Sequence, residues 1–66
     1  MSEYRVSVIE PQQKNQVRFM KFDNKEDAEH YAKNQSTTDN NHIYEVQKNN
    51  LGDFHPIKSY KNGQEI

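Results

Sequence analysis

The sequence predicts an α+β domain: a small antiparallel four-stranded sheet with one helix packed on one face, in the order ββαββ. Four short clusters of β-branched and aromatic residues are separated by polar segments, which is typical of short strands. One segment with helical periodicity lies between the second and third clusters. At 66 residues the chain is a single domain, 1–66, and folding at this length hides only about 60% of the surface that the unfolded chain exposes.

The first third of the chain predicts a hairpin. In the segment 4–8, apolar and polar residues alternate with period two, as in a strand with one buried face and one wet face. A polar connection over 11–16 follows, and its Pro11 cannot donate a hydrogen bond to a neighbouring strand. The second strand is predicted over 17–22. Its apolar residues fall on both faces, so we expect a bulge or a second contact surface there.

The segment 22–32 gathers four carboxylates and a histidine, residue types that also build catalytic and metal sites. Here they fit a helix start. Asp23 matches an N-cap, Glu26 matches its partner in a capping box, and an acidic first turn suits the positive end of the helix dipole. A stripe predicted to face the sheet consists of Ala28, Tyr31, Ala32 and Gln35. We therefore interpret this cluster as a helix start with a solvated face.

The second half of the chain predicts another hairpin. Strands are expected over 42–47 and 54–60, and Gly52 in the loop between them supplies a positive φ. Pro56 places the fourth strand at a sheet edge or at a bulge. Residues 62–66 form either a frayed tail or a short extra strand. The sheet therefore has four main strands, with the helix between the hairpins.

Several classes of chemical site lack their usual residues. Without cysteine, disulfides and thiolate zinc sites are excluded. His30, His42 and His55 lie on separate predicted elements, without the close pairing found in metal motifs. The two glycines lie in turns, so neither a nucleophile elbow nor a phosphate-binding loop is present. We therefore expect no catalysis, no metal and no cofactor.

Charge and hydropathy bear on location and partners. A formal net charge of -1 provides no overall field to attract nucleic acid or an anionic membrane. No apolar run approaches the ~18 residues that a membrane span needs, and no signal-peptide core precedes the first strand. We therefore expect a cytoplasmic protein that does not bind membranes. The small size and the Asn- and Lys-rich composition are compatible with a bacterial or phage accessory protein.

A lone helix covers one face of a sheet and leaves the other to water, to a partner or to a second copy of the chain. Several residues are of the types enriched at interface centres. The main hypothesis is a non-catalytic binding module, an interaction or accessory protein that uses its open sheet face or an edge strand, with a homodimer as one form. The residues proposed for this interface are Arg5, Arg18, Met20, Tyr44 and Tyr60.

The alternative hypothesis is single-stranded nucleic-acid binding. The segments 17–22 and 56–61 interleave aromatic and basic residues, the combination that stacks bases and neutralises phosphates on an open sheet. The residues proposed for this role are Arg18, Lys21, Lys58, Tyr60 and Lys61. In a purely structural interpretation of the same pattern, the aromatic residues form the core and the basic residues protect the sheet edges from aggregation. The sequence leaves these alternatives open.

Overall fold

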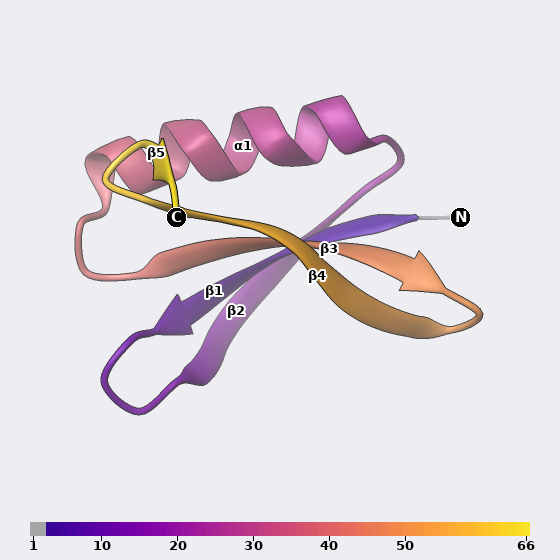
Figure 1. The fold of residues 1–66 in the computed structure, drawn as a ribbon, viewed down its shortest axis with the longest axis horizontal. Coiled ribbons are helices and arrows are strands. Elements are labelled where there is room, and N and C mark those ends of the chain that lie inside the picture. Colours follow the sequence, from indigo (N-terminus) through magenta and orange to yellow (C-terminus); the bar gives the residue numbers. More distant parts are fainter. Residues whose placement is uncertain (1–2) are drawn as a thin grey trace.

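The computed structural model describes residues 3–66 as an antiparallel sheet with one helix across one face (Figure 1). The α+β prediction is confirmed, and a two-residue fifth strand extends the predicted four, so residues 62–66 include the short extra strand. In chain order the elements are β1 (Tyr4–Glu10), β2 (Asn15–Phe22), α1 (Lys25–Thr38), β3 (Ile43–Asn50), β4 (Asp53–Lys61) and β5 (Gln64–Glu65).

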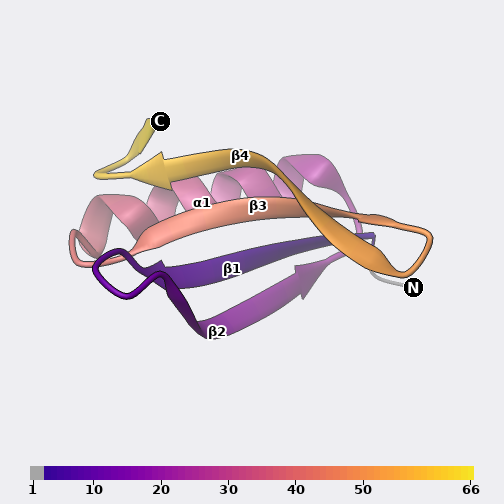
Figure 2. The same cartoon turned by 60° about the horizontal axis from the view of Figure 1, so that its bottom comes forward.

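The strands lie in the order β2-β1-β3-β4-β5, and every neighbouring pair is antiparallel. The strands β1 and β3 are central, while β2 forms one edge. Helix α1 packs mainly against β3, β4 and β1 and reaches β2 less. In the turned view it lies behind β3 and β4, and β2 lies away from it (Figure 2). One face of the sheet is therefore covered and the other is open.

The core lies between α1 and the central strands. Its buried apolar residues come from α1 and from the strands β1, β3 and β4, and they are Val6, Val8, Ala28, Ala32, Tyr44, Val46 and Tyr60. Because the helix contributes alanines, its backbone packs close to the sheet, and the strands supply the larger side chains. The Tyr31 ring bridges the layers, with its centroid 5.2 Å from that of Phe22 and 6.4 Å from that of Tyr44. The predicted helix stripe is confirmed at Ala28 and Ala32.

The helix begins one residue later than the sequence predicts. Asn24, not Asp23, is the N-cap: its side chain accepts a hydrogen bond from the backbone N–H of Asp27 at 2.8 Å. The Asn24 side-chain amide also donates to the Asp27 carboxylate at 3.1 Å, so the residue three positions after the cap that pairs with it is Asp27, not Glu26. Asp and Asn are equally good caps, so local preference could not choose between adjacent candidates.

Both outer long strands contain a register shift. In β2, Val8 pairs with Arg18 and Ile9 with Gln16, which leaves Val17 as an extra residue. In β4, the shift leaves Ile57 as the extra residue beside Pro56. The predicted bulge in the second strand is therefore present, and Pro56 lies next to a second bulge. Each shift changes which side chains share a face of the sheet.

Candidate binding face

We call the sheet surface opposite α1 the open face. Successive side chains of a strand point to opposite sides, and Val6, Tyr44 and Val46 lie beneath the helix, so their neighbours in sequence point the other way. Following the strand pairing across the sheet gives the main members of the open face: Arg5, Ser7, Ile9, Phe19, Lys21, Ile43, Glu45, Gln47, Phe54, Pro56, Ser59 and Lys61.

A row of aromatic and cationic side chains crosses one half of the open face. The guanidinium carbon of Arg5 lies 4.2 Å from the ring centroid of Phe54 and 5.3 Å from that of Phe19. These rings belong to β4 and β2, so the Arg5 guanidinium contacts aromatic rings from strands on both sides of β1. Cation–π attraction at such distances holds the guanidinium against the two rings. The ammonium of Lys21 lies 6.0 Å from the Phe19 ring and adds positive charge beside the row.

Polar contacts fix the orientation of Arg5. Its Nε donates to the Gln47 side-chain oxygen at 2.8 Å, and the Gln47 amide nitrogen donates to Glu45 at 2.7 Å. Gln47 is only 8% exposed, so its amide has little freedom. Within residues 3–66, the two Nη groups of Arg5 have no hydrogen-bond or ion-pair partner. The guanidinium of Arg5 is therefore held in place, and its Nη donors are available to a ligand.

The other half of the open face is hollowed. A depression of about 310 Å³ is open to solvent and is mainly aliphatic on its walls. Lys14 and Glu45 contribute charges at this hollow, and Glu45 also belongs to the hydrogen-bond chain that ends at Arg5. The full lining consists of Ile9, Pro11, Lys14, Ile43, Glu45, Ser59 and Ile66. The open face thus joins a cationic aromatic row to an apolar depression.

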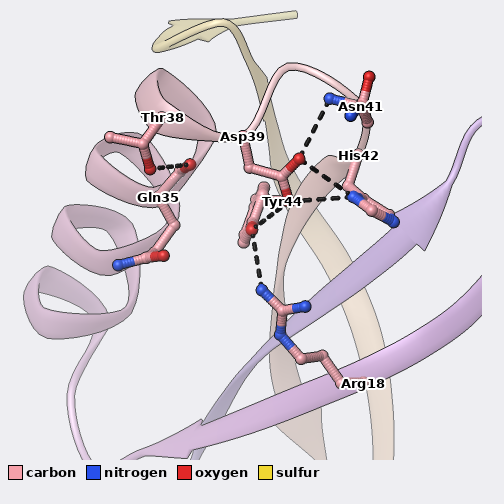
Figure 3. A network of polar contacts seen from close by, with 7 residues as sticks. All are labelled: Arg18, Gln35, Thr38, Asp39, Asn41, His42 and Tyr44. Atoms are coloured by element: carbon pink, nitrogen blue, oxygen red, sulfur yellow. Dashed lines mark hydrogen bonds and ion pairs between the residues drawn. The ribbon is translucent and has the colours of Figure 1, made fainter.

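A second cluster of polar groups lies at the C-terminal end of α1 (Figure 3). The Asp39 carboxylate accepts hydrogen bonds from the Tyr44 hydroxyl at 2.8 Å and from the Asn41 backbone N–H at 3.1 Å. His42 Nδ1 lies 2.9 Å and 3.1 Å from its two oxygens. Arg18 donates to the Tyr44 hydroxyl at 3.1 Å. These contacts join the loop after the helix to β3 and β2.

The cluster shifts the titration of two of its members. Burial raises the pKa of Tyr44 to about 12, and the hydrogen bond to Asp39 acts in the same direction. Partial burial pushes the pKa of Asp39 upward, but the hydrogen bonds from His42, Tyr44 and Asn41 outweigh it and lower that pKa below its ordinary value. Tyr44 thus stays neutral and Asp39 stays charged near neutral pH. The arrangement satisfies a buried hydroxyl and has a structural role.

The predicted interface residues divide between the two faces of the sheet. Arg5, Lys21 and Lys61 lie on the open face. Met20 pairs with Val6 and so lies on the helix side, but it is 47% exposed because α1 packs less extensively against β2 than against the central strands. Only part of the predicted set is therefore gathered on one surface.

The remaining predicted residues lie on the helix side. Tyr44 is 0% exposed and Tyr60 is 7% exposed, so both belong to the core and cannot contact a partner. Arg18 is bonded to the Tyr44 hydroxyl. The Lys58 ammonium lies 3.5 Å from Glu29, whose charge raises the pKa of Lys58. The predictions for Tyr44 and Tyr60 require correction, because alternation along the strands turns both toward the helix and buries them. Arg18 and Lys58 also lie on the helix side, but neither is buried.

Sequence reasoning missed other residues of the open face. Phe19, Phe54 and Gln47 complete the surroundings of Arg5, and Ile9 and Ile43 line the hollow. The alternation of Arg5, Ser7 and Ile9 along the first strand carried a signal for part of this surface. It could have been used only with knowledge of which side the helix covers.

Comparisons with protein-family models, with curated proteins and with solved structures give no match to this chain. Among residues 3–66, no helix has the length and apolar character to cross a membrane. The same residues contain no group of three or more His, Asp or Glu side chains placed to hold a metal ion. The fold and the face therefore define a class only: a small α+β protein with one covered and one open sheet face.

Proposed function

We propose that this protein is a non-catalytic binding module that binds a partner protein on its open face. The observation that carries the proposal is the pairing of a positioned Arg5 between Phe19 and Phe54 with an apolar hollow on the same surface. Aromatic residues and arginine are enriched at interface hot spots, and apolar pockets accept anchoring side chains. The small core leaves this apolar surface without a covering layer of its own.

Single-stranded nucleic acid is the second candidate ligand. Its support is the placement of Phe19 and Lys21 beside Arg5, since aromatic rings stack on bases and cations contact phosphates. The division of the basic residues weakens this candidate, because Arg18 and Lys58 are engaged on the helix side. We therefore rank a protein partner first.

Affinity capture with matched variants tests the proposal. Wild-type protein and the double variant Phe19→Ser/Phe54→Ser would be used as baits in a lysate of the source organism. The control bait is His30→Ala/Lys33→Ala, which changes two exposed helix residues on the other side of the molecule. We expect a protein that is captured by the wild type and the control and lost with the open-face variant. If every captured protein is retained by the open-face variant, the proposal is wrong.

Two further experiments distinguish a protein partner from nucleic acid and from a second copy of the chain. Nuclease treatment and a salt series identify capture through nucleic acid, because phosphate contacts weaken steeply as salt rises and apolar interfaces do not. Light scattering of the purified protein shows whether a second copy of the chain is the partner. In that case the mass of the wild type corresponds to two chains, and the double variant reverts to one. Circular dichroism of each variant confirms that it is folded.

A further inference from the structure

We infer that the partner presents an acidic peptide segment to the open face, with one carboxylate side chain on Arg5 and one aliphatic side chain in the hollow. The inference deepens the proposed function and rests on it. It names the chemistry of the partner from two features of the same surface: a guanidinium whose outer donors are unused within residues 3–66, and an aliphatic depression along the same strand.

The surroundings of Arg5 favour a carboxylate as its ligand. The guanidinium is planar, and its fork of N–H donors matches the two oxygens of a carboxylate in a bidentate pair. Gln47 already occupies Nε at 2.8 Å, and the rings of Phe19 and Phe54 restrict the position of the group. Because this ordering precedes binding, less side-chain entropy is lost when the ligand arrives.

The distribution of charge on the open face favours a single carboxylate over a chain of phosphates. Lys21 adds positive charge beside Arg5, but the carboxylate of Glu45 lies between Arg5 and the hollow. A polynucleotide backbone crossing this face would place phosphates close to Glu45. A peptide with one acidic and one aliphatic side chain places its carboxylate at Arg5 and its aliphatic group in the hollow, and it places no negative charge over Glu45.

The register of β1 gives the spacing of the two contacts. Arg5 and Ile9 lie on the same strand and the same face, with Ser7 between them. At ~3.3 Å per residue, four residues of strand span about 13 Å. An extended peptide has the same rise, so side chains four positions apart point to the same side and meet Arg5 and the hollow together. In a helix the same four-residue separation covers only about 6 Å.

Peptide titrations observed through the amide chemical shifts of the labelled protein test this inference. The probe is a capped peptide with one Glu and, four positions further on, one Leu, in a background of Ser and Thr. Two comparison peptides replace Glu with Gln or Leu with Ser. We expect saturable shifts around Arg5, Gln47 and Phe54 and around the hollow, with binding roughly tenfold weaker for either comparison peptide. Equal binding of the Glu and Gln peptides would overturn the inference.

Protein variants identify the group that reads the carboxylate. Arg5→Gln should weaken binding of the Glu peptide roughly tenfold and leave binding of the Gln peptide unchanged, because only the charge-assisted pair is lost. Arg5→Lys retains the charge without the bidentate fork and should bind more weakly than wild type. Lys33→Gln removes a charge from the exposed helix side as a matched control and should bind as wild type does. Equal losses in Arg5→Gln and Lys33→Gln would indicate a general charge effect and overturn the assignment.

The capture assay separates failure of this inference from failure of the proposed function. If the partner is lost with Phe19→Ser/Phe54→Ser but fully retained by Arg5→Gln, the open face binds a protein without an acidic contact, and only the inference fails. If the partner is retained by both variants, the proposed function fails as well. Salt-sensitive shifts at the same residues with a mixed-sequence single-stranded oligonucleotide, and none with the Glu peptide, would favour nucleic acid and contradict both.

Discussion

At the scale of single residues, Tyr44 and Arg5 show two uses of a polar group in a small domain. The Tyr44 hydroxyl is buried, and it is satisfied by donating to Asp39 and accepting from Arg18. Arg5 has one donor bonded to Gln47, and its Nη donors have no partner within residues 3–66. A buried polar group without a partner costs free energy, whereas an accessible one retains its capacity to bind. The first residue therefore serves the fold, and the second is the stronger candidate for function.

The raised pKa of Tyr44 predicts a loss of stability in alkali. The unfolded chain releases this proton near the ordinary value of 10.0, whereas burial and the bond to Asp39 keep it in place until about pH 12 in the folded chain. The stabilisation that the raised pKa of Tyr44 adds to the folded state is therefore complete below pH 10, and it is lost as the pH rises toward 12. Urea unfolding across this range measures the change in the free energy of unfolding.

The variant Tyr44→Phe is the control for this titration. It lacks the ionisable hydroxyl, so the alkaline loss should be shallower, and the remaining slope reports other groups such as Tyr60, whose pKa burial also raises. An alkaline slope as steep in Tyr44→Phe as in the wild type would contradict the role assigned to Tyr44.

At the scale of elements, turns and helix ends set the geometry of the sheet. The turn between β4 and β5 has positive φ at both Asn62 (56°) and Gly63 (77°), which suits a two-residue hairpin. The Gly63 N–H donates to the Ser36 hydroxyl at 3.0 Å, and a Cβ on Gly63 would lie 2.5 Å from the Thr37 hydroxyl oxygen. Only glycine combines this φ with so close an approach to the helix. The short strand β5 is thus held against the C-terminal end of α1.

The helix start provides a prediction at this scale. Asn24→Ala removes the side-chain acceptor of the Asp27 N–H and should lower the free energy of unfolding by about 1 kcal/mol. Asp23→Ala is the matched control: it changes the neighbouring exposed residue, which is not the cap, and should cost clearly less. Urea unfolding of both variants compares them. A larger loss of unfolding free energy in Asp23→Ala than in Asn24→Ala would show that Asp23 is the N-cap, as the sequence predicted.

At the scale of the whole molecule, α1 makes the two faces of the sheet unequal. The central strands β1 and β3 have a strand on each side and the helix above them. β2 has a strand on one side only, and β5 pairs with β4 only at Tyr60 and Lys61. The molecule therefore has a stable centre and two less protected edges, in addition to its open face.

Amide hydrogen exchange should follow this arrangement. We expect the slowest exchange in β1 and β3 and faster exchange along the outer edge of β2, because its backbone groups on that side have no neighbouring strand in the sheet. Residue-resolved exchange at two protein concentrations measures it. Protection of β2 equal to that of β1 would contradict a free edge. If that protection falls on dilution, a second copy of the chain covers the edge.

Local sequence patterns determined the class and order of the elements. Period-two alternation in 4–8, the helical stripe with Ala28 and Ala32, and the glycines of the turns each depend on neighbours within a few residues. These signals gave the α+β class, the antiparallel sheet with one helix and the approximate limits of each element. Residue type alone, not periodicity, made Arg5 and Lys21 candidates, and the structure places both on the open face.

The tertiary structure alone decided which side chains share a face. The helix packs over the side of Tyr44 and Tyr60 and so removes both from the candidate surface. The bulge at Ile57 then brings Phe54 onto the same side as Ser59, although their sequence separation is odd, and so places Phe54 against Arg5. Both outcomes depend on pairing between residues far apart in the chain, and a shift of one residue in a strand moves its side chains to the opposite face. Local periodicity contains no information on that choice.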